Sequence, residues 1–522
     1  MNLQSTRLQR EESKPDLGRT RARGSLAGAM SSEPEVPPAP SRRAFLLTAI
    51  GMAIALGALF ASIQSLPFFS ETYNHAAVAR AESSWLAAFE LARVPLRPLQ
   101  HLYFHGLTRF DSPAPALARL PGVLLHLGSA FLVICLAVQW GARRGTACLA
   151  GWLFLAAPNV KNLIWVSAIN APGRVFCILA VLVLYRCYEE RRNKLAALGV
   201  LVAFACAIGF HQAAIVAPVL LMAGIHARAE GGRVGECMRA IRSPLLLALT
   251  LLTAAYVFYM SFLREARHHG PRSLESLPAN AVKGTLALVP EELRQLAVEA
   301  LRGNLGAAGY LLGGVIVLLA LLFGLRCLLR GSAVVRFVAI CIAVDLGLHV
   351  LTAGFDQRYS YLSSAFLAVG LAVAAQGTGR TAKVLCVVLV PWWFANQARD
   401  IREYRAAGDA VHLVLDTASA ERARLGPDAV ITVVDLPEIW GSESDMPIFD
   451  WGFPQAMNAR GGGAWVLLRT SAFYKDTSAK LVTREEAIRQ LAAPGAQALI
   501  FNRSTSAFVD SMDDVMPMED AP

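Results

Sequence analysis

Glu71 is the first acid after the first strongly apolar segment, a position suited to proton transfer at a membrane surface. It lies in the stretch Pro67 to Leu107, which is far longer than a turn between two helices requires, and loops of that length are usually functional. A positioned carboxylate can take a proton from a hydroxyl group and contributes on the order of 10² to 10⁴ in rate. The structural alternative is an acid at the start of a predicted helix from Tyr73 to Ala92. We predict that Glu71 is catalytic.

Basic and aromatic residues at the ends of later apolar segments could bind an anion. A planar guanidinium neutralises a phosphate through paired hydrogen bonds, and tyrosine rings suit the headgroup region of a bilayer. The predicted substrate-binding residues are Arg97, Arg358, Tyr359, Tyr361, Arg174, Lys161 and His211. Each has a structural alternative, such as an arginine that reaches the membrane surface from a helix end, or a histidine in polar packing.

Asp345 and His349 lie four residues apart inside an apolar segment, on one helical face. An ionisable residue within a membrane span costs about 2.5 to 3.5 kcal/mol on insertion scales. In a transporter this pair would relay protons or ions. The alternative, which we favour, is an internal hydrogen-bonded pair that fixes helix packing, or a pair near the external end of a short span close to Arg358. Paired broken helices or inverted halves, which favour a transporter, are not evident in the sequence.

The composition is that of a polytopic membrane protein. The chain has 522 residues, of which 55% are hydrophobic and 17% charged; the mean hydropathy is +0.44. The net charge of +10 comes from basic residues between apolar runs, where they set orientation, and no nucleic-acid motif is present. The nine cysteines lie in or next to apolar segments without metal-ligand spacing, which indicates packing.

Apolar windows of about membrane-spanning length recur along the chain and predict an α-helical bundle of about eleven transmembrane helices. The windows are 44–66, 116–140, 145–158, 172–188, 194–210, 213–227, 244–263, 309–329, 334–353, 360–376 and 383–396. Basic residues fall at every second boundary, from Arg42 and Arg43 to Arg380 and Lys383, which places those boundaries in the cytoplasm. The alternate turns, 67–107, 158–172, 209–212, 264–304 and 355–361, then open on the external face.

The two ends of the chain differ from this membrane region. Residues 1–43 are predicted to be a disordered cytoplasmic tail, because they are rich in Arg, Glu, Ser and Pro. The run Ser41 to Leu46 resembles a twin-arginine export signal, but the apolar run behind it favours a signal anchor. Residues 44–396 form the transmembrane domain, with a first external loop at 67–115, and residues 397–522 form an external, periplasmic domain.

Short apolar runs predict that the domain at 397–522 is a small α/β domain. The predicted strands are 429–434, 465–468 and 498–501, and residues 483–491 read as a helix with a capping signal. The glycines at 461–463 precede a strand and not a helix, so we interpret them as a turn and not as a nucleotide-binding loop.

The order of several motifs resembles integral membrane glycosyltransferases of the GT-C superfamily. Leu96-Arg97-Pro98-Leu99 resembles the Tyr-Arg-Pro-Leu run of their first external loop, and Asp356 to Tyr361 resembles their Glu-Arg-Tyr-x-Tyr motif. Residues 124–127 and 151–174 resemble their second helix and a Trp-containing external segment, and residues 209–213 stand where many members carry a Lys-Glu pair. The resemblance is to polyprenyl-phosphate-sugar-dependent members of the protein O-mannosyltransferase type.

This resemblance implies a GT-C fold and an inverting sugar transfer from a polyprenyl-phosphate or polyprenyl-diphosphate donor to a hydroxyl of a glycan, lipid or protein. It implies that Glu71 is the catalytic residue and that Arg97 and Arg358 hold the departing lipid phosphate. No metal or cofactor is demanded by the acids present. The bias toward Ala, Arg and Gly is typical of a bacterium with GC-rich DNA, which gives a multi-pass protein of the bacterial inner membrane.

The sequence departs from the family pattern at three places, which leaves alternatives open. Ser70-Glu71 stands where an acid pair is common, His211-Gln212 replaces the Lys-Glu pair, and Ala157 and Asn162 stand where His and Glu are frequent. One alternative is a non-catalytic GT-C relative. The other is a transporter or lipid-handling protein that uses Asp345 and His349.

Overall fold

The computed structural model describes the chain from residue 42 onward in separate stretches. They are 42–69, 71–82, 84–89, 97–109, 114–228, 243–260, 322, 325–326, 329, 331–352, 357–377, 380–426, 430–436, 439–440, 446–447, 449, 453–459, 464–469, 480–492, 497–502 and 507–509. The chain divides into two units, Met1–Ala39 and Pro40–Pro522, and every described element belongs to the second.

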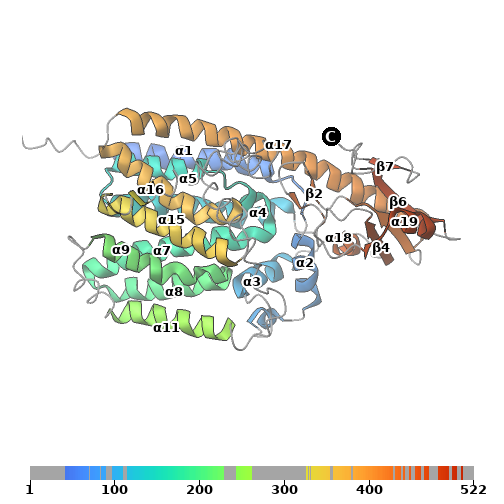
Figure 1. Ribbon diagram of the computed structural model, residues 1–522, viewed down its shortest axis with the longest axis horizontal. Helices are drawn as coiled ribbons and strands as arrows, with labels where there is room; N and C mark the ends of the chain where they lie inside the picture. The colour runs from blue at the N-terminus through green and yellow to red at the C-terminus, as the bar shows by residue number, and fades with distance from the viewer. Residues whose placement is uncertain are drawn as a thin grey trace, which may run out of the picture. The chain divides into compact units, whose positions relative to one another are not determined.

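Apolar helices form the body of this unit (Figure 1). They are α1 (Arg42–Ile63), α4 (Pro115–Gln139), α5 (Arg144–Ala156), α7 (Asn170–Arg191), α8 (Lys194–Phe210), α9 (Ala217–Arg228), α11 (Pro244–Phe258), α15 (Ala333–Thr352), α16 (Tyr361–Gly377) and α17 (Arg380–Leu425). Helix α4 contacts α5, α7 and α16, helix α7 packs on α8, and α15 contacts both α9 and α16. The predicted α-helical bundle is confirmed in this part of the chain.

Some of these helices are long enough to span a membrane. Among the described residues, Phe45–Ile63, Pro115–Gln139 and Val166–Arg191 are long and apolar enough to cross a bilayer, and four shorter apolar helices accompany them. Ten of the predicted windows coincide with helices, whereas most of the window 309–329 lies outside the described residues. The total of about eleven spans stays a prediction.

Short helices connect the long ones at one end of the bundle. They are α2 (Glu71–Ala81), η1 (Trp85–Phe89), α3 (Pro98–Leu107), α6 (Lys161–Ile164), η2 (Val166–Ile169), η3 (Gln212–Val216) and η6 (Gln357–Ser360). Helix α2 contacts α3 and η2, helix α3 contacts η1 and α8, and both η3 and η6 contact α15. Four of the turns predicted to open on one face therefore contribute elements that gather together, whereas the turn 264–304 lies outside the described residues. The side of the membrane that they face stays a prediction.

The helix predicted from Tyr73 to Ala92 is wrong in its length. Helix α2 ends at Ala81, and the separate 3₁₀ turn η1 begins at Trp85. Between them the side chain of Ser84 accepts a hydrogen bond from the N–H of Leu86 at 3.2 Å. Such a hydrogen bond between a serine side chain and a nearby backbone N–H competes with the hydrogen bonds of an α-helix, which explains the break between α2 and η1.

Strands and short helices follow α17. The five-stranded sheet has the order β5 (Lys480–Leu481), β4 (Ala464–Arg469), β1 (Val430–Val434), β6 (Gln497–Asn502), β7 (Ala507–Val509). Strands β5, β4, β1 and β6 pair in parallel, and β7 pairs antiparallel to β6. The three predicted strands correspond to β1, β4 and β6.

The remaining elements of this region are β2 (Ile439–Trp440), β3 (Met446–Pro447), α18 (Phe453–Ala459) and α19 (Arg484–Leu491). The predicted cap of α19 is confirmed, because the Thr483 side chain accepts the N–H of Glu486 at 3.2 Å. Helix α18 packs on α2, so this region contacts the helix that begins at Glu71. Helix α17 is continuous through residues 396 and 397, so the predicted domain boundary falls inside one helix.

Gly173 allows the ends of α7 and α8 to approach each other. A Cβ atom added there would lie 2.6 Å from three ring atoms of Phe210, a distance that real Cβ atoms do not tolerate. Because Gly173 precedes Arg174 and Phe210 precedes His211, this approach also brings two predicted site residues to the same place.

We expect Gly173→Ala to destabilise the protein by about 1 to 3 kcal/mol, the usual cost of overpacking a close contact. Thermal unfolding in detergent micelles measures the loss. Gly57→Ala on α1 is the matched control, because a Cβ atom there meets nothing within 4 Å. Equal melting temperatures for the two variants would contradict the close approach.

Candidate functional site

Arg97 is held at the start of α3 by Gln100 of the same helix and by two residues at the start of η3. Its Nε donates to Oε1 of Gln212 at 3.1 Å, its Nη1 donates to Oε1 of Gln100 at 3.5 Å, and its Nη2 lies 3.3 Å from Nε2 of His211. Gln100 in turn donates from Nε2 to the carbonyl of Ser167 at 2.8 Å. These contacts join the first loop to η3 through Arg97 and to η2 through Gln100.

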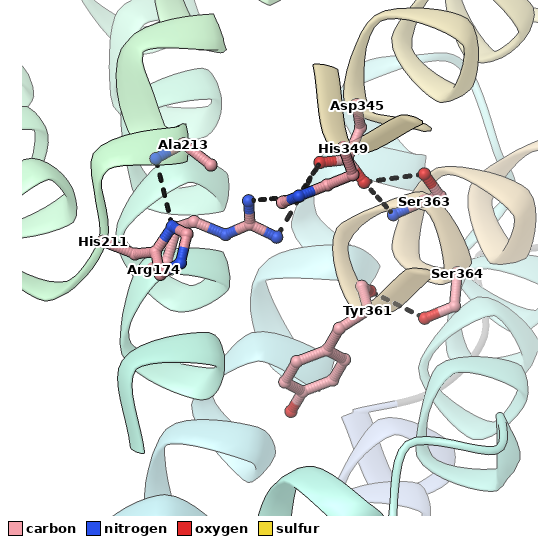
Figure 2. Close-up of polar contacts among 8 residues, drawn as sticks. All are labelled: Arg174, His211, Ala213, Asp345, His349, Tyr361, Ser363 and Ser364. Atoms are coloured by element: carbon pink, nitrogen blue, oxygen red, sulfur yellow. Dashed lines mark hydrogen bonds and ion pairs between the residues drawn. The ribbon is translucent and has the colours of Figure 1, made fainter. Parts of the chain in front are cut away.

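The contact between Arg97 and His211 pairs two donors. Nδ1 of His211 accepts the N–H of Ala213 at 3.1 Å (Figure 2), so a neutral ring carries its proton on Nε2. That Nε2–H then faces Nη2 of Arg97 at 3.3 Å. An anionic oxygen between the two groups would accept from both, which makes this a suitable place for a phosphate.

A second polar cluster surrounds Arg174 of α7. Its Nη1 lies 3.0 Å from Nε2 of His349, and its Nη2 lies 3.8 Å from Oδ1 of Asp345 (Figure 2). Oδ2 of Asp345 accepts both the N–H of Ser363 at 3.1 Å and its hydroxyl at 2.7 Å. The His349 ring stacks on Tyr359, with ring centroids 4.3 Å apart and the planes 12° from parallel. Arg174, Asp345 and His349 are buried, so these groups stabilise one another away from water.

The two clusters adjoin. The rings of His211 and His349 have centroids 6.4 Å apart. Residues from α7, α8, α15, η6 and the first loop therefore meet at one end of the bundle. Four of the predicted residues belong to this site: Arg97, Arg174, His211 and Tyr359.

For two predicted residues, only the position of the backbone next to the site is described. Arg358 precedes Tyr359 in η6, and Glu71 is the first residue of α2, which packs on α3 behind Arg97. Their side chains lie outside the described residues. Their roles stay predictions.

Tyr361 and Lys161 are placed differently. Tyr361 is fully buried, its hydroxyl hydrogen-bonds to Nδ1 of His126, and its ring lies parallel to Phe154, with centroids 5.5 Å apart. Figure 2 shows its ring pointing away from Arg174. Lys161 begins α6, and no contact within the described part of the chain links it to either cluster. The structure thus joins neither side chain to the site.

Sequence reasoning missed Gln100 and Ser363. Gln100 stands one helical turn after Arg97, a spacing that brings the two side chains to one face of α3. The pair Asp345 and His349 matches the packing interpretation, because both contact Arg174 and lie beside η6.

Two histidines of the first loop, His75 and His101, lie on helices α2 and α3 close to Arg97. The ring of His75 on α2 stacks on Phe104 of α3, with centroids 5.0 Å apart, and lies 6.2 Å from the ring of His101. Burial, aided by the charges of His101 and Arg97, lowers the pKa of His75 from 6.5 to about 4. His75 is therefore neutral at pH 7 because it is buried next to other basic groups.

We expect Asp345→Asn to destabilise the protein by about 3 to 5 kcal/mol, because it leaves a buried guanidinium without its carboxylate. Thermal unfolding in detergent measures the effect. Ser363→Ala is the control, since it keeps the carboxylate and loses one hydrogen bond worth about 1 kcal/mol. The double variant Asp345→Asn with Arg174→Gln should regain part of the loss; strictly additive effects would refute the pairing.

We expect stability to fall as the pH drops from about 6.5 toward 4. Over this range the unfolded chain protonates His75 while the folded chain does not, since the folded pKa is the lower one. Melting temperatures measured across this range should therefore decline less for His75→Gln than for the parent. His412→Gln on the exposed surface of α17 serves as the control. Identical pH profiles for His75→Gln and the parent would contradict the buried neutral ring.

Comparisons with known proteins give matches among solved structures only. No protein-family model matches the chain, and no curated protein matches it. ArnT from Cupriavidus metallidurans bound to undecaprenyl phosphate is 13% identical, with 88% of this chain and 94% of that chain covered and a TM-score of 0.46. Its apo state is 13% identical, with 88% and 93% covered and a TM-score of 0.44.

The arabinofuranosyltransferase AftD from Mycobacteria is 15% identical, with 89% of this chain and 35% of that chain covered and a TM-score of 0.40. At TM-scores below 0.5, such likeness concerns the course of the chain and assigns no residue, ligand or activity.

Proposed function

We propose that this protein is a membrane glycosyltransferase of the GT-C type, which transfers a sugar from a polyprenyl-phosphate-linked donor to an acceptor hydroxyl on the external face of the membrane. The observation that carries the proposal is the meeting of Arg97, His211 and Arg174 at one end of an apolar helix bundle. Their donor groups suit a phosphate, and the apolar helices suit a lipid tail.

The charges of the site support a phosphate as ligand. Arg97 and Arg174 bring two guanidinium groups to the site, and the carboxylate of Asp345 lies 3.8 Å from the guanidinium of Arg174. The guanidinium of Arg97 donates to Oε1 of Gln212 and to Oε1 of Gln100. A departing lipid phosphate would bring negative charge next to this guanidinium, and such preorganised donors stabilise the charge that develops in a transition state.

The chemical step follows from the residues around this position. Glu71 takes the proton from the acceptor hydroxyl, and the acceptor oxygen attacks the anomeric carbon as its bond to the phosphate oxygen breaks. The electron pair of that bond leaves on the phosphate, which Arg97, His211 and Arg358 receive. Attack opposite the leaving group inverts the anomeric centre. Helices α2 and α3 pack together, which supports a carboxylate at the start of α2 and a guanidinium at the start of α3 acting on one substrate.

The proposal is tested with purified protein and polyprenyl-phosphate sugars in a cell-free transfer assay. We expect Glu71→Gln to lower kcat by on the order of 10² to 10⁴ and Arg97→Ala by about 10² or more. Arg97→Lys should restore less than half of the loss, because a lysine cannot make the paired bonds of a guanidinium. Arg80→Ala is the control, since Arg80 is an exposed arginine on α2.

Full activity of Glu71→Gln would remove Glu71 from the mechanism. If Glu71→Gln loses activity while Arg97→Ala keeps the kcat of the parent, Glu71 remains the proposed base but Arg97 does not bind the departing phosphate.

A further inference from the structure

Arg119 is a buried arginine that the proposed reaction does not use. It lies in the second turn of α4 and is 1% exposed. Its Nη1 donates to the carbonyls of Leu66 at 2.7 Å and Pro115 at 3.3 Å, its Nη2 donates to that of Pro67 at 2.6 Å, and its Nε donates to that of Ile164 at 2.9 Å. Burying a guanidinium is costly unless its donors are satisfied. Here the described partners are all main-chain carbonyls, so the cation is used to hold backbone.

Three of the four carbonyls that Arg119 binds, those of Leu66, Pro67 and Ile164, lie at or just after the end of a helix. Leu66 and Pro67 follow the C-terminus of α1, and Ile164 is the last residue of α6. Carbonyls at and just after a helix end lack intrahelical partners, so a cation with several donors can satisfy them. A forked guanidinium can bind two such segments at once, whereas an ammonium cannot match that geometry.

The segment from Leu66 to Phe69 is also fixed from its other side by α17. Tyr404 packs edge-on against Phe69, with ring centroids 5.5 Å apart. Gly408 approaches so closely that a Cβ atom there would lie 2.9 Å from Cδ of Pro67. The carbonyl of Phe69 then accepts the N–H of Thr72 at 3.1 Å, and α2 begins at Glu71. The backbone path that leads to Glu71 is thus set by α4 on one side and α17 on the other.

The same turn of α4 also holds α3. The hydroxyl of Tyr103 donates to the carbonyl of Ala118, the residue before Arg119. Tyr103 lies in α3, the helix that begins directly after Arg97. Ala118 and Arg119 therefore connect one turn of α4 both to the segment before Glu71 and to the helix after Arg97.

We propose that Arg119 is a positioning residue, which sets the place of Glu71 relative to Arg97 by holding the backbone of Leu66 and Pro67. This inference rests on the proposed function for the role of Glu71. It predicts that removing the hydrogen bonds of Arg119 to Leu66 and Pro67 makes the start of α2 more mobile and slows the chemical step, while the donor still binds at Arg97.

The test compares Arg119→Met and Arg119→Lys with the parent in the full chain. Hydrogen exchange is measured on peptides covering residues 66–76 and, as the internal reference, residues 170–191 of α7. We expect Arg119→Met to speed exchange in 66–76 by about tenfold or more and to leave 170–191 unchanged, as in a local opening. In the transfer assay kcat should fall by about 10-fold to 100-fold with KM changed by less than about twofold.

Arg119→Lys should recover part of both effects, because it keeps the charge and some of the hydrogen bonds. Arg422→Met is the matched control. Arg422 also donates to main-chain carbonyls, those of Ala464 at 2.8 Å and Gly426 at 3.4 Å, but these lie in the region after α17. It should leave exchange in 66–76 unchanged.

Unchanged exchange in 66–76 for both Arg119 variants would overturn the proposal, and so would faster exchange that spreads equally to 170–191. A rise in KM that accounts for the whole loss of activity would do the same. If Arg119→Met does not fold, Arg119→Lys and Tyr103→Phe carry the test with the same readouts. Full activity of Glu71→Gln would remove Glu71 from the mechanism and with it the catalytic consequence proposed for Arg119, while the exchange measurement would still decide whether Arg119 holds the segment.

Discussion

The ion pair between Arg174 and Asp345 is the interaction on which the rest of the site depends. A charged side chain within a membrane span costs several kcal/mol unless it finds a partner there. Arg174 finds Asp345 at 3.8 Å and His349 at 3.0 Å, and Ser363 donates to the same carboxylate from the start of α16. The need to satisfy one buried guanidinium thereby ties α7, α15 and α16 together at the end where η6 begins.

Loops far apart in the sequence reach this place because the helices cross the bundle in alternate directions. The first loop contributes Arg97, the end of α8 contributes His211, and η6 contributes Tyr359. Gly173 permits the close approach of α7 and α8 that this convergence requires. A fixed frame of apolar helices can therefore carry a polar site made of residues that are individually unremarkable.

The parts of this account that depend on repeating patterns could be predicted from the sequence. Apolar length predicted the helices, and the alternation of basic boundaries predicted that turns distant in the sequence share one end, where the structure brings Arg97, Arg174, His211 and Tyr359 together. The interruption at Ser84 was not predictable from periodicity, because a single side-chain hydrogen bond decides it. Arg119 escaped notice because its partners are main-chain carbonyls, which have no signature in the sequence. Tyr361 was misleading because its neighbours His126 and Phe154 come from other helices.

The most direct measurement of the central claim is the affinity of the protein for a polyprenyl phosphate compared with that for the corresponding polyprenol. If Arg97 and His211 share one anionic oxygen, the phosphate should bind about 10²-fold more tightly than the alcohol, and Arg97→Ala and His211→Ala should remove this preference non-additively. Equal affinity for the two lipids, or strictly additive losses, would contradict the site.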